Sequence, residues 1–112
     1  MRVYCASPYT STDPACVALN IAHAQAVGQQ VRALGHVPFV PHIALPYFPD
    51  LTIEEAWEPA MRECLSHLET CDVIVLTGDW QRSKGCRTEL AAAYGLKIRV
   101  CFSLDEIGEV AA

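Results

Sequence analysis

The residues best suited to chemistry lie within one short stretch, residues 78–90, which reads GDWQRSKGCRTEL. Gly85 would allow backbone amides to approach a ligand, and Ser83 adds a hydroxyl group. Free N–H groups at the start of a helix favour an anion. The stretch also holds three of the eight basic residues of a chain whose net charge is −5, namely Arg82, Lys84 and Arg87. The pattern predicts a phosphate-binding loop, with a solvated basic loop as the alternative.

Glu89 follows this loop in the first turns of an expected helix, four residues after Gly85. Glycosidic bonds break through an oxocarbenium-like transition state, so a carboxylate can attack or stabilise the anomeric carbon. A second group must then protonate the leaving group. In the alternative interpretation, Glu89 only complements the helix dipole.

The elements that must position these residues alternate between strand and helix patterns. Apolar residues recur every three or four positions between a cap at Asp13 and a stop at Gly35, as an amphipathic helix requires. Pro38 places its strand at a sheet edge, and Pro59 is expected to break or restart its helix. We expect strands over 2–6, 37–40, 73–77 and 98–102, and helices over 14–34, 52–69, 86–94 and 104–110.

This order predicts one α/β domain spanning residues 1–112. Helical connections between successive strands force parallel crossovers. The fold class is therefore a three-layer Rossmann-like or flavodoxin-like fold around four or five parallel strands. Ligands bind such sheets beyond the carboxyl ends of the strands, where the loops 7–13, 41–51 and 78–85 would lie.

The first two of these loops carry further candidates for ligand binding, Ser7, Tyr9 and His42. His42 would act as a base or phosphate contact, or as a structural histidine that bonds the following loop. Four aromatic residues near the expected entrance could stack on a base or pack against a second subunit, namely Tyr47, Phe48, Trp57 and Trp80.

Composition excludes several classes of protein. No apolar run is long enough to span a membrane, and the amino terminus leaves no room for a signal peptide. The net charge of −5 argues against a general nucleic-acid binder. The six cysteines form no Cys-x-x-Cys pair and indicate buried thiols in a cytoplasmic protein rather than disulfides or a zinc site. Neither a metal nor a cofactor is expected.

Four short motifs together resemble a known family. They are Tyr4-x-Ala6-x-Pro8-Tyr9, Gly35-His36-x-Pro38-x-x-Pro41-His42, Cys71-Asp72-Val73-Ile74-Val75 and Ser83-x-Gly85-x-x-x-Glu89-Leu90. Over residues 2–102 the chain is similar to the nucleoside 2-deoxyribosyltransferase-like superfamily, and within it to small bacterial and phage domains of unknown function. The Gly-x-x-x-Glu element is moderately specific, and the combined set is more so.

The resemblance implies roles for particular residues. Glu89 matches the glutamate that attacks the sugar C1′ carbon, and Tyr9 matches an aromatic residue that contacts sugar or phosphate. Asp79 lies where the superfamily places an acidic residue near the base. The transferases usually have aspartate at the position of Ser83, whereas the related 2′-deoxynucleoside 5′-monophosphate N-glycosidases bind phosphate through a serine there. Ser83 therefore favours nucleotide hydrolysis over base exchange.

The sequence leaves three functions open: a nucleotide N-glycosidase or deoxyribosyltransferase, a non-catalytic nucleotide-binding regulatory domain, and an interaction module. The expected partner is a nucleoside or nucleotide. The apolar content of 52% and the loop 41–51 also predict a homodimer or a higher homo-oligomer. Its contact would include Tyr47, Phe48 or Trp57, next to Met61, and neighbouring subunits often complete the active sites of the superfamily.

Overall fold

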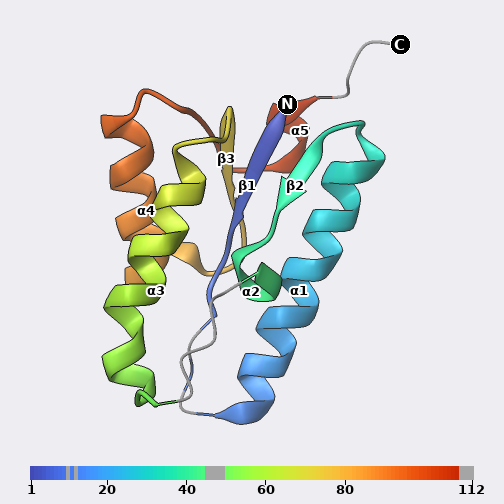
Figure 1. Cartoon of the computed structure of the whole chain (residues 1–112). Helices are drawn as coiled ribbons and strands as arrows, with labels where there is room; N and C mark the ends of the chain where they lie inside the picture. Colours follow the sequence, from blue (N-terminus) through green and yellow to red (C-terminus); the bar gives the residue numbers. More distant parts are fainter. Residues whose placement is uncertain (10, 12, 45–49, 109–112) are drawn as a thin grey trace.

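The computed structural model describes residues 1–9, 11, 13–44 and 50–108, apart from the side chains of residues 43, 44 and 53. In this part of the chain, four parallel strands form one sheet in the order β2-β1-β3-β4 (Figure 1). The strands are β1 (Arg2–Ala6), β2 (Val37–Phe39), β3 (Val73–Leu76) and β4 (Arg99–Cys101). The parallel α/β prediction is confirmed, and so is the edge position of the strand that contains Pro38.

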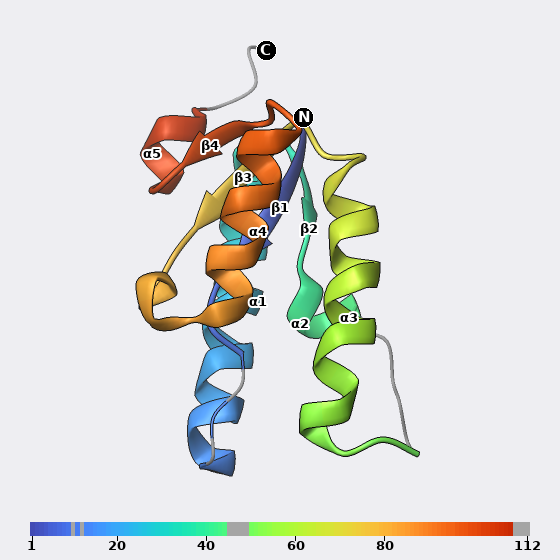
Figure 2. The ribbon, with the colours of Figure 1, turned by 90° about the vertical axis from the view of Figure 1, so that its left-hand side faces the viewer.

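Helices cover both faces of this sheet, which completes the three layers (Figures 1 and 2). Helix α1 (Pro14–Ala33) and the short α5 (Leu104–Ile107) pack on one face. Helices α3 (Ile53–Leu68) and α4 (Lys84–Gly95) pack on the other. A one-turn helix α2 (Pro41–Ala44) follows β2.

The two faces are built from alternate residues of the central strands, because successive side chains of a strand point to opposite sides. In β1, Val3 and Cys5 join the core under α1 and α5. Tyr4 and Ala6 join the core under α3 and α4. All four residues of β3 are buried, as expected for a parallel strand covered on both faces.

The helix ends follow the sequence signals. The side chain of Asp13 accepts a hydrogen bond from the Ala15 N–H at 3.0 Å, and Pro14 occupies the first turn of α1. Gly35 has a φ of +92°, a conformation that glycine adopts readily after a helix. Thr52 and Glu55 form the expected capping box at the start of α3.

Four expectations about the helices are wrong. The helix expected over 104–110 ends at Ile107, where Gly108 adopts a φ of +76°. Pro59 lies inside a continuous α3 and does not break it. The proline deprives the carbonyl of Glu55 of its partner, but Glu55 is exposed in the first turn, where water can bond that carbonyl. Helix α4 begins at Lys84 rather than Cys86, because Ser83 caps it. The predicted loop 41–51 begins with α2, and its residues 45–49 lie outside the described part of the chain.

The cysteines are free thiols, as predicted, but one departs from the expected burial. Cys16 is exposed on α1, while the other five are buried. Within the described ranges, no helix is long and apolar enough to cross a membrane.

Candidate functional site

Glu89 and Tyr4 form a buried pair between α4 and the central strand β1. Glu89 is only 6% exposed, and the Tyr4 hydroxyl donates a hydrogen bond to its Oε2 atom. Tyr4 itself is fully buried in the core under α3 and α4. The pair therefore joins the helix that carries the candidate nucleophile to the middle of the sheet.

Burial controls the protonation of both groups. Desolvation raises the pKa of Glu89 to about 7, although the hydrogen bond from Tyr4 opposes this rise. The pKa of Tyr4 is raised, first by burial and then by the neighbouring Glu89 carboxylate, so its hydroxyl keeps its proton and remains a donor. A carboxyl group that titrates near neutrality, held in one orientation, is typical of catalytic sites.

Sequence reasoning quoted Tyr4 within a motif but gave it no role. The available signal was a tyrosine between Val3 and Cys5 in a buried strand. A buried tyrosine hydroxyl needs a hydrogen-bond partner. Only the tertiary structure shows that this partner is Glu89, 85 residues further along the chain.

Ser83 lies six residues before Glu89 and caps helix α4. Its Oγ atom accepts a hydrogen bond from the Cys86 N–H at 3.2 Å, and its carbonyl accepts one from the Arg87 N–H at 3.0 Å. The N–H groups of Lys84 and Gly85 form no hydrogen bond with the described residues. The start of α4 therefore offers two backbone donors and the Ser83 hydroxyl proton to an anion.

The three cations of the predicted phosphate loop are not equally available. The Lys84 ammonium lies 4.1 Å from the centre of the Trp57 ring on α3, a cation–π contact. Arg87 donates a hydrogen bond from Nη1 to the Gln81 carbonyl at 2.9 Å. The Arg82 side chain makes no ion pair or hydrogen bond with the described residues, which leaves its guanidinium available to a ligand.

Gly85 has a packing role that sequence reasoning did not predict. A Cβ atom added there would lie 3.2 Å from the Met61 Cε atom of α3 and 3.8 Å from the Ser83 Oγ atom. The missing side chain therefore lets α4 approach α3 closely. The close approach of a ligand to Gly85 remains a prediction.

A second polar group lies at the carboxyl end of β1. His42 of α2 is 9% exposed, and its Nε2–H donates to the Pro8 carbonyl at 2.8 Å, with the Ser7 Oγ atom 3.4 Å away. The Tyr9 ring meets the His42 ring edge-on, with centroids 5.3 Å apart. The structure thus brings together three sequence-predicted site residues from two different loops.

His42 is held as a neutral imidazole with one unused acceptor. Burial lowers its pKa, and the hydrogen bond to Pro8 only partly offsets this. With its proton on Nε2, the ring has a lone pair on Nδ1. That atom is buried and has no hydrogen-bond partner among the described residues. His42 therefore bonds the first loop rather than the loop that follows it, and its contact with a ligand remains a prediction.

The remaining candidate residues form no described hydrogen bond with the Tyr4–Glu89 pair. Asp79 is exposed, and the described residues include no hydrogen bond or ion pair between it and Glu89. Trp80 stacks on Phe102 with ring centroids 5.4 Å apart, which connects the turn Trp80–Arg82 to the end of β4. Tyr47 and Phe48 lie outside the described residues.

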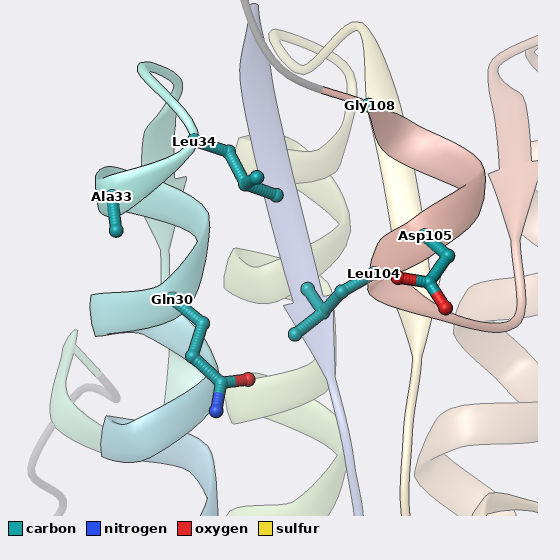
Figure 3. Close-up of a pocket in the computed structure, with 6 residues that line it drawn as sticks. All are labelled: Gln30, Ala33, Leu34, Leu104, Asp105 and Gly108. Atoms are coloured by element: carbon teal, nitrogen blue, oxygen red, sulfur yellow. The ribbon is translucent and has the colours of Figure 1, made fainter.

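No group of three or more His, Cys, Asp or Glu residues in the described ranges is arranged to hold a metal ion. A cavity of about 430 Å³ lies elsewhere, between the last turns of α1 and helix α5 (Figure 3). It is on the sheet face opposite α4, and Asp105 is the one acidic or basic residue in its lining. The cavity is lined by Gln30, Ala33, Leu34, Leu104, Asp105 and Gly108.

Comparison with known proteins agrees with the fold. Residues 1–102 match the family described as Domain of unknown function (DUF4406), and the chain belongs to that family. Among solved structures, it is similar to a 2-deoxyribosyltransferase from the psychrotolerant bacterium Bacillus psychrosaccharolyticus. The two are 26% identical with a TM-score of 0.67, over 89% of this chain and 69% of that one. No curated protein matches the sequence.

Proposed function

We propose that this member of the DUF4406 family cleaves the N-glycosidic bond of a nucleoside or deoxynucleoside 5′-monophosphate. Glu89 is the proposed nucleophile, and the start of α4 is the proposed phosphate site. Water as the acceptor gives an N-glycosidase, and a second base as the acceptor gives a deoxyribosyltransferase. The observation that carries the proposal is the buried Tyr4–Glu89 pair on the same helix as the donors of Ser83, Lys84 and Gly85, which precede Glu89 by four to six residues.

The proposed chemistry proceeds in two displacements. An oxygen of the Glu89 carboxylate forms a bond to the anomeric carbon, while the C–N bond breaks and the base leaves with a proton. Asp79 is the candidate donor of that proton. The acceptor then forms a bond to the same carbon while the bond to Glu89 breaks, and the proton that the acceptor loses passes to the Asp79 carboxylate. The Tyr4 hydroxyl orients the reacting oxygens throughout.

Similarity to a 2-deoxyribosyltransferase supports a reaction at a nucleoside sugar. Phosphate specificity rests on this chain's own residues. The Ser83 hydroxyl and the N–H groups of Lys84 and Gly85, which have no partner among the described residues, lie at the start of α4, and Arg82 directly precedes them in the chain. Neutral His42, with its unused Nδ1 lone pair, would accept a hydrogen bond from a ligand hydroxyl or amino group.

The direct test is incubation with a panel of ribo- and deoxyribonucleoside 5′-monophosphates, with free base measured by chromatography. We expect release of base by the wild type and at least about a hundredfold loss in the Glu89→Gln variant, the scale of losing a positioned catalytic group. Glu63→Gln, which removes an exposed glutamate from α3, is the matched control and should keep full activity. Full activity in a folded Glu89→Gln protein would rule out the mechanism.

The phosphate site is tested by Ser83→Asp. Aspartate caps a helix as well as serine does, so α4 should remain intact, but its charge repels phosphate. We expect monophosphates to bind the wild type more tightly than the matching nucleosides, and Ser83→Asp to remove most of that difference. Arg82→Gln should reduce it at least about tenfold, as expected for a lost charge-assisted bond. Equal binding of nucleosides and monophosphates to the wild type would exclude a phosphate site at this loop.

The same panel separates catalysis from binding alone. A regulatory nucleotide-binding domain would bind a monophosphate through the α4 loop, release no base, and bind it equally well after Glu89→Gln. An interaction module would bind neither class of ligand. Calorimetry beside the chromatographic assay therefore distinguishes the three functions.

A further inference from the structure

The order of the strands creates a switch point between the carboxyl ends of β1 and β3. The sheet runs β2-β1-β3-β4, so the chain leaves β1 toward one edge of the sheet and β3 toward the other. In open parallel sheets, ligands bind outside the carboxyl ends of the strands at such a reversal. Ser7 and Pro8 follow β1 at this point, and Thr77 and Gly78 follow β3. The two segments are joined where the Thr77 N–H donates to the Ala6 carbonyl at 3.0 Å.

Helix α1 reaches this switch point through His23. The His23 Nε2 atom lies 3.0 Å from the Thr77 Oγ1 atom, in hydrogen-bond contact. Gly78, with a φ of +69°, packs beside them, and a Cβ atom there would lie 3.3 Å from Pro8 Cδ and 3.6 Å from His23 Nε2. The first turns of α1 extend past the ends of the strands (Figures 1 and 2), and His23 is exposed there. His23 therefore stands on the side of the sheet where a ligand is expected.

His42 approaches the same point from the end of β2. Its Nε2–H bonds the Pro8 carbonyl, and its buried Nδ1 atom has no partner among the described residues. Burial lowers the pKa of His42, and a positive charge on His23 lowers it further, so the two rings lie close enough to interact. A buried acceptor without a hydrogen bond is costly and rare in native proteins. The free Nδ1 lone pair therefore indicates a ligand at the switch point.

The His23–Thr77 contact offers a ligand one donor and one acceptor, whichever tautomer His23 adopts. If Nε2 carries the proton, it donates to Thr77, and the Thr77 hydroxyl proton and the His23 Nδ1 lone pair stay free. If Nδ1 carries the proton, Thr77 donates to Nε2, and the Nδ1–H group and a Thr77 lone pair stay free. The Nδ1 atom of His42 adds a second acceptor. Among the described residues, no charged side chain bonds any of these three.

We propose that His23, Thr77 and His42 form a subsite for the nucleobase of the substrate, which we call the base subsite. The edge of a nucleobase has N–H donors beside ring-nitrogen or carbonyl acceptors, which complements one donor and two acceptors without charge. A phosphate has acceptors and a negative charge, so it matches the start of α4 instead. The inference rests on the proposed function, because it divides one nucleotide between these two places.

The base subsite and the proposed phosphate site lie on opposite sides of the sheet edge. Glu89 and Ser83 belong to α4, which packs with Tyr4 on one face of the sheet. His23 belongs to α1, which packs on the other face. A nucleotide with its phosphate at α4 would therefore extend its base across the ends of β1 and β3.

The test compares ligands with and without a base by calorimetry, in the Glu89→Gln protein so that no substrate is cleaved. The ligands are nucleoside 5′-monophosphates, the matching nucleosides, and ribose 5-phosphate and 2-deoxyribose 5-phosphate, which have no base. We expect His23→Phe to lower the affinity for the tightest-binding monophosphate and for its nucleoside at least about tenfold, because a base loses a hydrogen bond. The affinity for the base-free sugar phosphates should stay within about twofold.

Thr77 provides a matched series of variants. Thr77→Val removes the hydroxyl at a similar volume and should lose as much affinity as His23→Phe, whereas Thr77→Ser keeps the hydroxyl and should keep the affinity. Because His23 and Thr77 act as one bonded pair, the losses in the double variant should not add. His67→Phe is the control, since His67 is an exposed histidine of α3 that stacks on Phe39, and it should change no affinity.

The outcomes separate this inference from the proposed cleavage, which is judged by release of base from the wild type. Equal losses for ligands with and without a base, or full affinity for all of them in a folded His23→Phe protein, would overturn the base subsite. Losses confined to ligands with a base would support it, even where the wild type released no base. A wild type that binds none of these ligands would overturn both proposals. Circular dichroism shows which variants are folded.

Discussion

Replacing Glu89 with glutamine should change the way in which the stability of the protein depends on pH. In the folded protein, burial raises the pKa of Glu89 from its ordinary value of 4.5 to about 7. Between these values the folded state keeps a proton that the unfolded chain releases, so the free energy of unfolding falls as the pH rises. Above pH 7 the buried carboxylate is ionised, at a cost of roughly 3 kcal/mol. Below pH 4.5 Glu89 is protonated in both the folded and the unfolded state, so this cost is absent and the folded protein keeps its full stability.

Glutamine accepts the hydrogen bond from Tyr4 but does not ionise. We therefore expect Glu89→Gln to gain stability relative to the wild type by about 3 kcal/mol between pH 4.5 and pH 8, as the wild type loses its proton. Urea unfolding followed by circular dichroism at a series of pH values measures this difference directly. The exposed Glu63→Gln should differ from the wild type by less than about 0.5 kcal/mol at every pH. A difference between Glu89→Gln and the wild type that does not vary with pH would refute the reasoning.

Three further predictions concern residues around this pair. Tyr4→Phe removes the hydrogen bond that lowers the pKa of Glu89, so the acidic limb of the profile of base release against pH should move to higher pH. An unmoved limb would exclude a positioning role for Tyr4. His42→Gln keeps an N–H donor for the Pro8 carbonyl but removes the Nδ1 acceptor, so the affinity for the nucleotide should fall at least about tenfold while the melting temperature is unchanged. An unchanged affinity would contradict contact between His42 and the ligand. Gly85→Ala directs a methyl group at the flexible end of the Met61 side chain on α3 and gains helix propensity, so the free energy of unfolding should change by less than about 1 kcal/mol. A loss above about 2 kcal/mol would show that α3 and α4 cannot move apart to accept the methyl group.

Whether the similarity to a 2-deoxyribosyltransferase extends to its chemistry depends on the phosphate site. The fold resembles that of a 2-deoxyribosyltransferase, and Glu89 is a buried carboxyl group bonded to Tyr4. The resemblance implies that the residue at position 83 distinguishes the proposed hydrolysis of nucleotides from transfer between nucleosides. The effect of Ser83→Asp on the binding of monophosphates and nucleosides therefore tests the substrate class directly.

The sequence alone determined the order of the elements and most of their bounds. Local sequence signals predicted the ends of helices correctly where one or two residues determine the backbone conformation, as at Asp13, Gly35 and the capping box of Thr52. The alternation of buried strands with helices then left a parallel sheet as the only simple arrangement. Local signals failed at Pro59, because the effect of a proline on a helix depends on whether water reaches the carbonyl four residues earlier.

The tertiary structure decided how the candidate site is assembled. Contacts between residues far apart in the chain, such as Tyr4 with Glu89 and Ser7 with His42, leave no periodic signal in the sequence. The pKa of Glu89 likewise follows from burial, which depends on the packing of α4 against the sheet. The sequence determined which groups could do chemistry, and packing determined which of them are buried, paired or free to meet a ligand.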